Sequence, residues 1–190
     1  MMKRAMVCVA AAAIAFVPSM SQAQRRSASQ PLHFGVGAGV AMPMSDWSDV
    51  VGTGFHLEGI GTKNLSGSPV FLRGEAAFTM FGSKTLATGL GAGNDWKGSG
   101  SQIAGMFDVG YNFASTSTVK PYVLGGLGLH HSTMKVDFGG SSASDSKDDL
   151  GVNVGGGMRF KMGGRVAYLE ARYISAGDVK SLPIGFGVEF

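Results

Sequence analysis

The sequence predicts an all-β protein, a closed antiparallel barrel of eight transmembrane strands that follows a cleaved signal peptide. Three observations lead to this prediction. Long segments alternate between apolar residues and polar residues or glycine, the 31 glycines are spread among these segments, and the N-terminus has the layout of an export signal. Together these features favour strands that cross a membrane, because such strands place apolar side chains on one face only.

The first 23 residues have the organisation of a signal peptide. Lys3 and Arg4 give a positive start, residues 5–17 are uncharged, and Ser21–Ala23 places small residues where a signal peptidase cleaves. We expect cleavage after Ala23, a short N-terminal segment over residues 24–31 and one barrel domain over residues 32–190. The alternative is an uncleaved N-terminal anchor, although the apolar run is too short to cross a core of about 30 Å as a helix.

Charge and cysteine content exclude several classes of function. Of the 16 Lys and Arg residues, Lys3 and Arg4 lie in the predicted signal peptide, which leaves 14 against 13 acidic residues. This balance gives no indication of a nucleic-acid partner. The only cysteine, Cys8, also lies in the signal peptide. The mature chain therefore has no disulfide, thiol nucleophile or cysteine metal ligand.

Alternation with a period of two is clearest over residues 151–162. Val152, Val154 and Phe160 share one face, whereas Asn153 and Arg159 share the other. A strand of this length suits a tilted path through a membrane, since strands of soluble proteins are nearer about 5 or 6 residues. Similar segments occupy residues 32–42, 72–80, 102–113, 169–173 and 184–190, and weaker ones occupy residues 53–62 and 121–134, which gives eight strands.

The connections between the predicted strands alternate in length, as expected for a barrel with long loops at one end. The short turns are Asn64–Ser68, Ala114–Val119 and Gly163–Arg165, and the longer polar loops are Met44–Val51, Gly82–Ser99 and Val136–Asp149, with a modest fourth loop at Ser175–Ser181. If the first strand runs outward, the long loops lie outside the cell and both termini are periplasmic.

The polar face of the strands is predicted to line the lumen. Buried charges normally need partners, and the interior of an eight-stranded barrel has room for little besides side chains. We therefore expect a structural charge network. Its predicted members are Glu58, Arg73, Glu75, Asp108, Arg159, Lys161, Glu170, Arg172 and Glu189. In the alternative, an ordinary soluble sandwich, the apolar face would be the core.

The chain resembles the small outer-membrane β-barrel domain proteins of the OmpA, OmpX and Ail type. The resemblance lies in KPYVLGGLGL (120–129), GVNVGGGMRF (151–160), LEARY (169–173) and GVEF (187–190). It implies residence in the outer membrane of a Gram-negative-type bacterium, contact with outer-membrane lipid and lipopolysaccharide, and biogenesis through periplasmic chaperones and the barrel-insertion machinery. Phe186, Val188 and Phe190 resemble the insertion signal. The resemblance implies no single activity, because one fold hosts many functions.

The leading functional hypothesis is an integral outer-membrane barrel with a structural or adhesion-like role and no enzymatic activity. Trp47 and Trp96, in the first two long loops, are the predicted contact residues, because loops on a rigid scaffold often carry binding functions. The surface ligand is not readable from the sequence. A small pore is the second hypothesis.

The third hypothesis is an enzyme that modifies lipid A. His130 and Ser132 fall on one strand face, and a base beside a hydroxyl nucleophile needs an orienting acid, for which the candidates are Asp137, Asp145 and Asp148. We assign no catalytic residue, cofactor or metal site. The adjacent His130 and His131 point to opposite faces of a strand and cannot easily share an ion.

Overall fold

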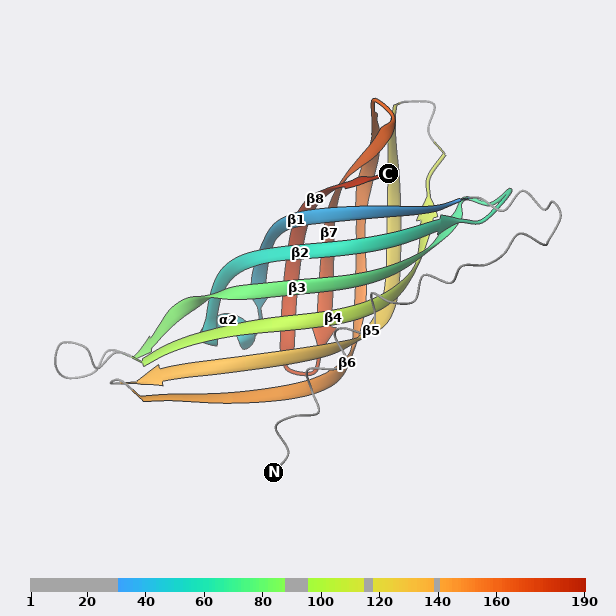
Figure 1. Ribbon diagram of the computed structural model, residues 1–190. Helices are drawn as coiled ribbons and strands as arrows, with labels where there is room; N and C mark the ends of the chain where they lie inside the picture. The colour runs from blue at the N-terminus through green and yellow to red at the C-terminus, as the bar shows by residue number, and fades with distance from the viewer. Residues whose placement is uncertain (1–30, 88–95, 115–117, 139–140) are drawn as a thin grey trace, which may run out of the picture.

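The computed structural model describes residues 31–87, 96–114, 118–138 and 141–190. These residues form eight antiparallel strands in sequence order, and β1 pairs with both β2 and β8, so the sheet closes into a barrel (Figure 1). The predicted barrel is thus confirmed. The predicted signal peptide, residues 1–23, lies outside the described residues.

The elements are β1 (Leu32–Met44), α2 (Trp47–Val50), β2 (Val51–Asn64), β3 (Val70–Ala87), β4 (Trp96–Asn112), β5 (Val119–Phe138), β6 (Ser141–Met162), β7 (Arg165–Ala176) and β8 (Val179–Glu189).

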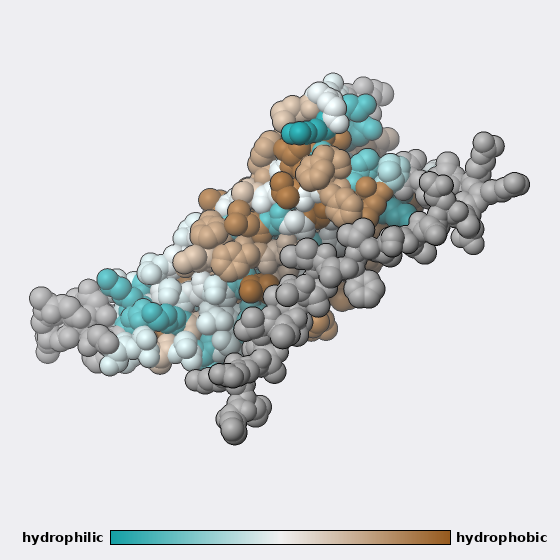
Figure 2. Space-filling model, in the orientation of Figure 1, coloured by the Kyte–Doolittle hydropathy of each residue, from teal (hydrophilic) through white to brown (hydrophobic). Residues whose placement is uncertain are grey.

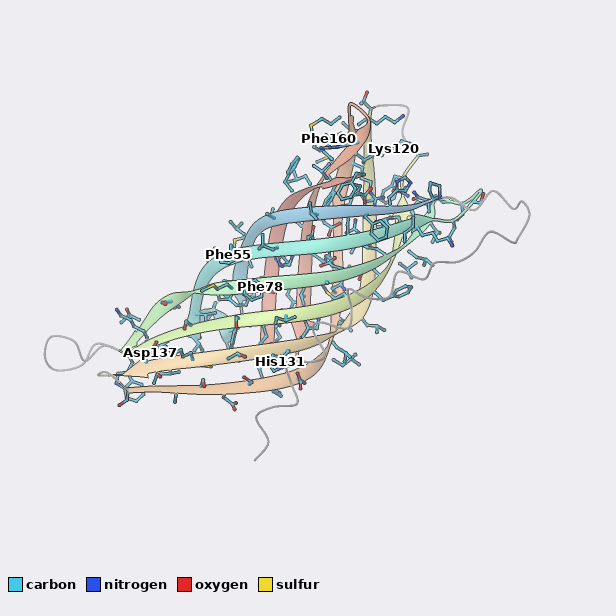
Figure 3. The ribbon with its side chains drawn as sticks, in the orientation of Figure 1. Phe55, Phe78, Lys120, His131, Asp137 and Phe160 are labelled. Carbon is cyan, nitrogen blue, oxygen red and sulfur yellow. The ribbon has the colours of Figure 1, made fainter. Side chains whose placement is uncertain are left out.

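The alternating pattern sorts side chains to the two faces of the barrel wall. Large apolar side chains such as Val36, Ile103 and Val152 are exposed on the outside. On the face shown in Figure 2, apolar side chains form a band across the middle of the molecule, with polar residues toward the projecting end. Phe55 and Phe78 lie in this band with ring centroids 6.0 Å apart (Figure 3). An apolar outer band of this kind is what a barrel presents to lipid.

Among the described residues, no helix has the length and apolarity needed to cross a bilayer.

Four strands extend well beyond the others at one end of the barrel. We call residues 82–87 and 96–101 of β3 and β4, and 131–138 and 141–148 of β5 and β6, the projecting wall (Figure 1). This corrects the predicted loops Gly82–Ser99 and Val136–Asp149, much of which is strand. Thr133 Oγ1 and Ser146 Oγ are 2.9 Å apart across β5 and β6. The β6 strand of this hairpin carries Ser, Asp or Lys on both faces, so it lacks the alternation that marks a strand in sequence.

The remaining two connections at this end are short. The predicted loop Met44–Val51 contains α2, which a hydrogen bond from Lys84 Nζ to the Ser48 carbonyl (2.5 Å) ties to β3. The predicted loop Ser175–Ser181 is a tight turn in which Gly177 has a φ of 56°. A positive φ strains residues with a Cβ, which explains a glycine at this position.

Several lumenal glycines provide space for aromatic rings on the neighbouring strand. Gly110 faces Phe71, and Gly187 faces Tyr168. A Cβ added at either glycine would overlap the facing ring. These pairs explain part of the high glycine content, because each aromatic side chain lies flat against the wall only where the facing residue has no side chain.

Replacing Gly110 by alanine should therefore destabilise the barrel by about 1–3 kcal/mol, because overpacking forces a buried ring to move. Unfolding in urea, followed after reconstitution in detergent, measures this change. Gly105→Ala is the matched control on the same strand, since a Cβ there meets nothing within 4 Å. Equal stability of the two variants would contradict the packing role of Gly110.

Candidate functional site

Arg172 on β7 lies at the centre of the lumen among four buried carboxylates. Its Nη2 is 2.6 Å from Glu75 Oε2 and 3.6 Å from Glu58 Oε2, and its Nη1 is 3.4 Å from Asp108 Oδ2. Glu170, two residues earlier on the same strand, contacts both its Nε and its Nη2. Arginine suits this role because its planar guanidinium carries five donors.

A second layer of charge lies beside this centre. Arg73 Nη1 donates to Glu170 Oε2 at 2.7 Å, and the Tyr122 hydroxyl donates to the same oxygen. Arg159 Nη2 is 3.5 Å from Glu189 Oε1, and its guanidinium carbon lies 4.4 Å from the Tyr122 ring centroid. Stacking of a guanidinium on an aromatic face adds cation–π attraction to the ion pairs.

We call the buried charged residues the lumen charge network. Its members are Glu58, Arg73, Glu75, Asp108, Arg159, Glu170, Arg172 and Glu189. Lys161, which the sequence placed among them, is exposed instead. It lies one residue before the end of β6, at the end of the barrel opposite the projecting wall, where its ammonium reaches solvent. The network fills the narrow interior with side chains, which argues against the pore hypothesis.

Three aromatic residues of the lumen escaped the sequence analysis. Phe71, Tyr122 and Tyr168 are fully or almost fully buried, and the Tyr168 hydroxyl donates to Glu58 Oε1 at 2.6 Å. Aromatic residues on the polar face of a strand break the alternation that was used to assign faces. The pairing of each with a cross-strand glycine is the sequence signal that could have revealed them.

The predicted insertion residues lie on the last strand and at its end. Phe186 and Phe190 are exposed on the outside of the barrel, and Val188 is half-buried. The Phe190 amide donates to the Phe34 carbonyl at 2.8 Å, so the terminus is paired with β1.

The residues of the lipid A hypothesis do not form a site on the lipid side. His130 and Ser132 are buried and point into the barrel, where Ser132 Oγ accepts a hydrogen bond from Gln102 Nε2 at 3.0 Å. Neither ring nitrogen of His130 has a hydrogen-bond partner among the described residues. Of the candidate acids, Asp148 pairs with His131 and Asp137 with Lys135 on the exposed hairpin. The pair therefore faces the lumen and not the surrounding lipid, and Asp145, the third candidate acid, is exposed on β6.

Trp47 is buried, which corrects its prediction as an exposed contact residue. Its side chain is 8% exposed and packs edge-on against Phe81 with ring centroids 5.8 Å apart. It belongs to a small apolar core with Ala41, Val51 and Val179, which closes the lumen at the level of α2. Trp96, the second predicted contact, is 44% exposed at the start of β4 in the projecting wall.

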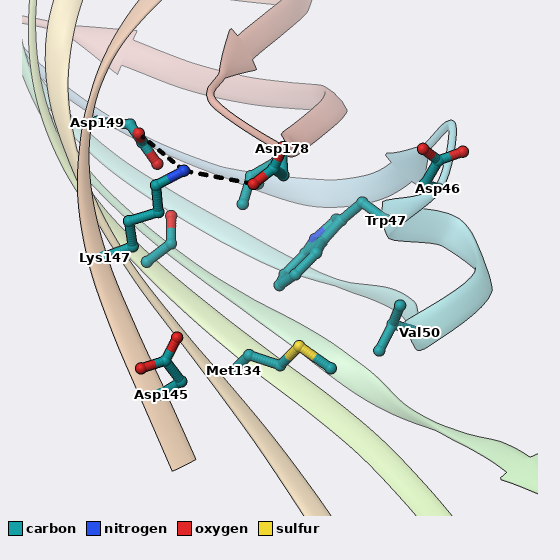
Figure 4. A pocket seen from close by; sticks show the side chains of 10 residues that line it. Asp46, Trp47, Val50, Met134, Asp145, Lys147, Asp149 and Asp178 are labelled. Atoms are coloured by element: carbon teal, nitrogen blue, oxygen red, sulfur yellow. Dashed lines mark hydrogen bonds and ion pairs between the residues drawn. The ribbon is translucent and has the colours of Figure 1, made fainter.

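A pocket of about 280 Å³ opens above this apolar core, at the foot of the projecting wall (Figure 4). We call it the mouth pocket. It is lined by Asp46, Trp47, Val50, Ser132, Met134, Asp145, Lys147, Asp149, Asp178 and Val179. Its floor is apolar, and four carboxylates surround it against a single ammonium. The Trp47 Nε1–H has no hydrogen-bond partner among the described residues. The pocket thus offers apolar contact and net negative charge.

Lys147 connects two of these carboxylates. Its Nζ lies 3.3 Å from Asp178 Oδ2 and 3.3 Å from Asp149 Oδ1 (Figure 4). Hydrogen bonds to Asp178 and Asp149 raise the pKa of the Lys147 ammonium above its usual value. Lys147 therefore stays charged at neutral pH, while Asp46 and Asp145 have no ammonium beside them in the pocket lining.

Comparison with known proteins places this architecture in a family. A model of the family described as "Outer membrane protein beta-barrel domain" matches residues 9–190. The chain belongs to this family. Among curated proteins, no match was found. The protein is thus an outer-membrane β-barrel, with its apolar band in contact with lipid.

Solved structures of other outer-membrane barrels share the fold. Neisserial surface protein A is 21% identical, with 83% of this chain and 95% of that chain covered and a TM-score of 0.52. Ail, the attachment invasion locus protein of Yersinia pestis, is 20% identical over 84% of this chain and 99% of its own, also with a TM-score of 0.52. A major outer membrane protein from Thermus thermophilus is 13% identical over 85% of this chain and 99% of its own, with a TM-score of 0.61.

Substitution of Arg172 by methionine should strongly destabilise the barrel, by about 3–5 kcal/mol, because buried carboxylates would lose their common partner. Urea unfolding of the reconstituted protein measures the change. Lys135→Met, which removes an exposed ion pair with Asp137, should cost less than about 1 kcal/mol. An Arg172 variant as stable as wild type would show that the lumen charge network does not hold the barrel together.

Proposed function

We propose that this outer-membrane barrel is a surface-recognition protein with an adhesion-like role, and that the mouth pocket binds a cationic group attached to an apolar body. The observation that carries the proposal is the composition of the pocket, in which four carboxylates and one ammonium surround a floor of Trp47, Val50, Met134 and Val179. A cation would gain from the excess of negative charge, and an attached apolar group would displace water from the floor.

The position of the pocket supports an outward-facing role. With the first strand running outward, the projecting wall and the mouth pocket lie at the cell surface. The barrel below is a rigid support, and sites on strands hold their geometry better than sites on loops. The projecting wall, including the exposed Trp96, would extend the contact surface beyond the pocket.

The charge of the pocket also distinguishes its ligand from a polyanion. Ail of Yersinia pestis has been crystallised with the heparin analogue sucrose octasulfate. In this chain Asp46, Asp145, Asp149 and Asp178 would repel sulfate groups at the mouth pocket. We therefore propose a basic partner, such as a lysine- or arginine-bearing protein surface, in place of a sulfated glycan.

Export and membrane insertion depend on the two ends of the chain. We propose that residues 1–23 are a cleaved signal peptide and that Phe186, Val188 and Phe190 are read by the insertion machinery after passage with periplasmic chaperones. Contact with lipopolysaccharide follows from residence in the outer membrane. We also propose that the protein is not an enzyme, which is supported by the lumenal position of His130 and Ser132.

The pocket can be tested with Trp47 as the reporter. The chain has two tryptophans, so Trp96→Phe leaves Trp47 as the only indole fluorophore. Phenethylammonium, a cation on an aromatic body, should change Trp47 fluorescence in a saturable way, whereas phenylacetate should not. Asp149→Asn together with Asp178→Asn should weaken binding by about tenfold or more, since charge-assisted hydrogen bonds contribute about 1.5–3 kcal/mol.

Asp137→Asn is the control, because it removes a carboxylate of the projecting wall that does not line the pocket. Equal responses to the cation and the anion, or unchanged affinity in the double variant, would rule out charge recognition at this pocket. Adhesion of cells that display the double variant then tests whether the pocket serves a surface partner.

A further inference from the structure

The buried charges of the lumen do not balance. Among the described residues, the buried carboxylates are Glu58, Glu75, Asp108, Glu170 and Glu189, and the buried guanidinium groups are Arg73, Arg159 and Arg172. Five negative charges therefore face three positive ones. Because an uncompensated buried charge is costly, a bound cation would stabilise this interior.

Two of the buried carboxylates lie close together, with a histidine, in the wall formed by β2 and β3. A ring nitrogen of His56 and one carboxylate oxygen each of Glu58 and Glu75 all lie within 4.8 Å of one another, and all three residues are buried. His56 and Glu58 are two residues apart on β2, so both point into the lumen, and Glu75 reaches them from β3. Bond lengths of about 2.0–2.2 Å to a shared ion would require only a small approach of these atoms.

One carboxylate oxygen of this cluster lacks a donor. Glu75 Oε2 accepts from Arg172, but Glu75 Oε1 is buried and has no hydrogen-bond partner among the described residues. His56 Nε2 is 3.6 Å from Glu58 Oε2, which is too long for a hydrogen bond. Glu75 Oε1 is therefore a buried acceptor that receives no hydrogen from the described residues, a situation that a bound cation resolves.

The orientation of His56 suits a metal ligand. Its Nδ1 lies 2.8 Å from the Thr79 hydroxyl on β3. With Nδ1 as the donor, Nε2 carries the free lone pair and faces Glu58. Hydrogen bonds of this kind to the second ring nitrogen orient histidine ligands in metalloproteins. A cavity of about 10 Å³ beside the cluster is lined by His56, Glu58, Glu170 and Arg172, and it has space for about one water molecule.

We propose that His56, Glu58 and Glu75 bind one divalent transition-metal ion, such as Zn²⁺ or Mn²⁺, inside the lumen. One imidazole and two carboxylates form a donor set that suits these ions. The positive charge of the ion would offset the excess of carboxylates over guanidinium groups in the lumen. Arg172 donates to Glu75 Oε2, which leaves Glu75 Oε1 free for the ion, and its Nη2 lies 3.6 Å from Glu58 Oε2. The ion would join β2 to β3 and stabilise the folded barrel.

Cobalt titration tests the proposal directly. The folded, detergent-solubilised wild-type barrel, first treated with a chelator, should bind one equivalent of Co²⁺ with visible absorption bands that Zn²⁺ removes. His56→Gln and Glu75→Gln should each weaken binding at least tenfold. Glu189→Gln should bind as wild type, because it removes a buried lumenal carboxylate that contacts Arg159 and Thr62 instead of the cluster.

A second variant keeps the test informative if His56→Gln does not fold. The chain has four histidines, and replacing His33, His130 and His131 by glutamine leaves His56 alone. This triple variant should still bind one equivalent of Co²⁺. Absence of stoichiometric binding by the folded wild-type barrel, or binding lost in the triple variant, would overturn the proposal.

Discussion

The closed ring of eight strands is the constraint on which the rest of the structure depends. It satisfies the backbone within the membrane, and it leaves an interior so narrow that side chains must fill it. Most polar residues of the alternating pattern are thereby forced into that space. The central position of Arg172, the stacking of Arg159 on Tyr122, and the glycines opposite the aromatic rings are all solutions to packing charge where water is scarce.

The sequence predicted the membrane-spanning part of the fold because lipid imposes a simple rule on it. Side chains that face lipid are apolar, such as Val152, whereas side chains that face the lumen are polar, such as Arg159. Where lipid ends, the rule ends too. The first part of β6, within Val136–Asp149, is held by its backbone ladder with β5, which leaves no periodic trace in side chains that are polar on both faces.

The functional residues were predictable only in part, because their roles depend on partners that are distant in sequence. Charge alone was enough to assign Glu58 and Glu75 to the lumen. The meeting of His56 with Glu75 depends on the register between β2 and β3, which no local pattern specifies. Trp47 was misjudged for a similar reason, since only the fold shows that α2 turns its indole toward Phe81. Lys161 was wrongly assigned to the lumen. Its position in the alternating pattern predicts an inward side chain, but it lies next to the end of β6, where the side chain reaches solvent.

The polar hairpin of β5 and β6 has a consequence for how this surface can change over time. Its register is held by main-chain hydrogen bonds, and its Ser, Asp and Lys side chains are exposed, so most replacements there leave the fold intact. The lipid-facing and lumenal positions have no such freedom. Sequence drift should therefore concentrate on the part of the molecule that meets the surroundings of the cell, while the embedded part stays nearly constant.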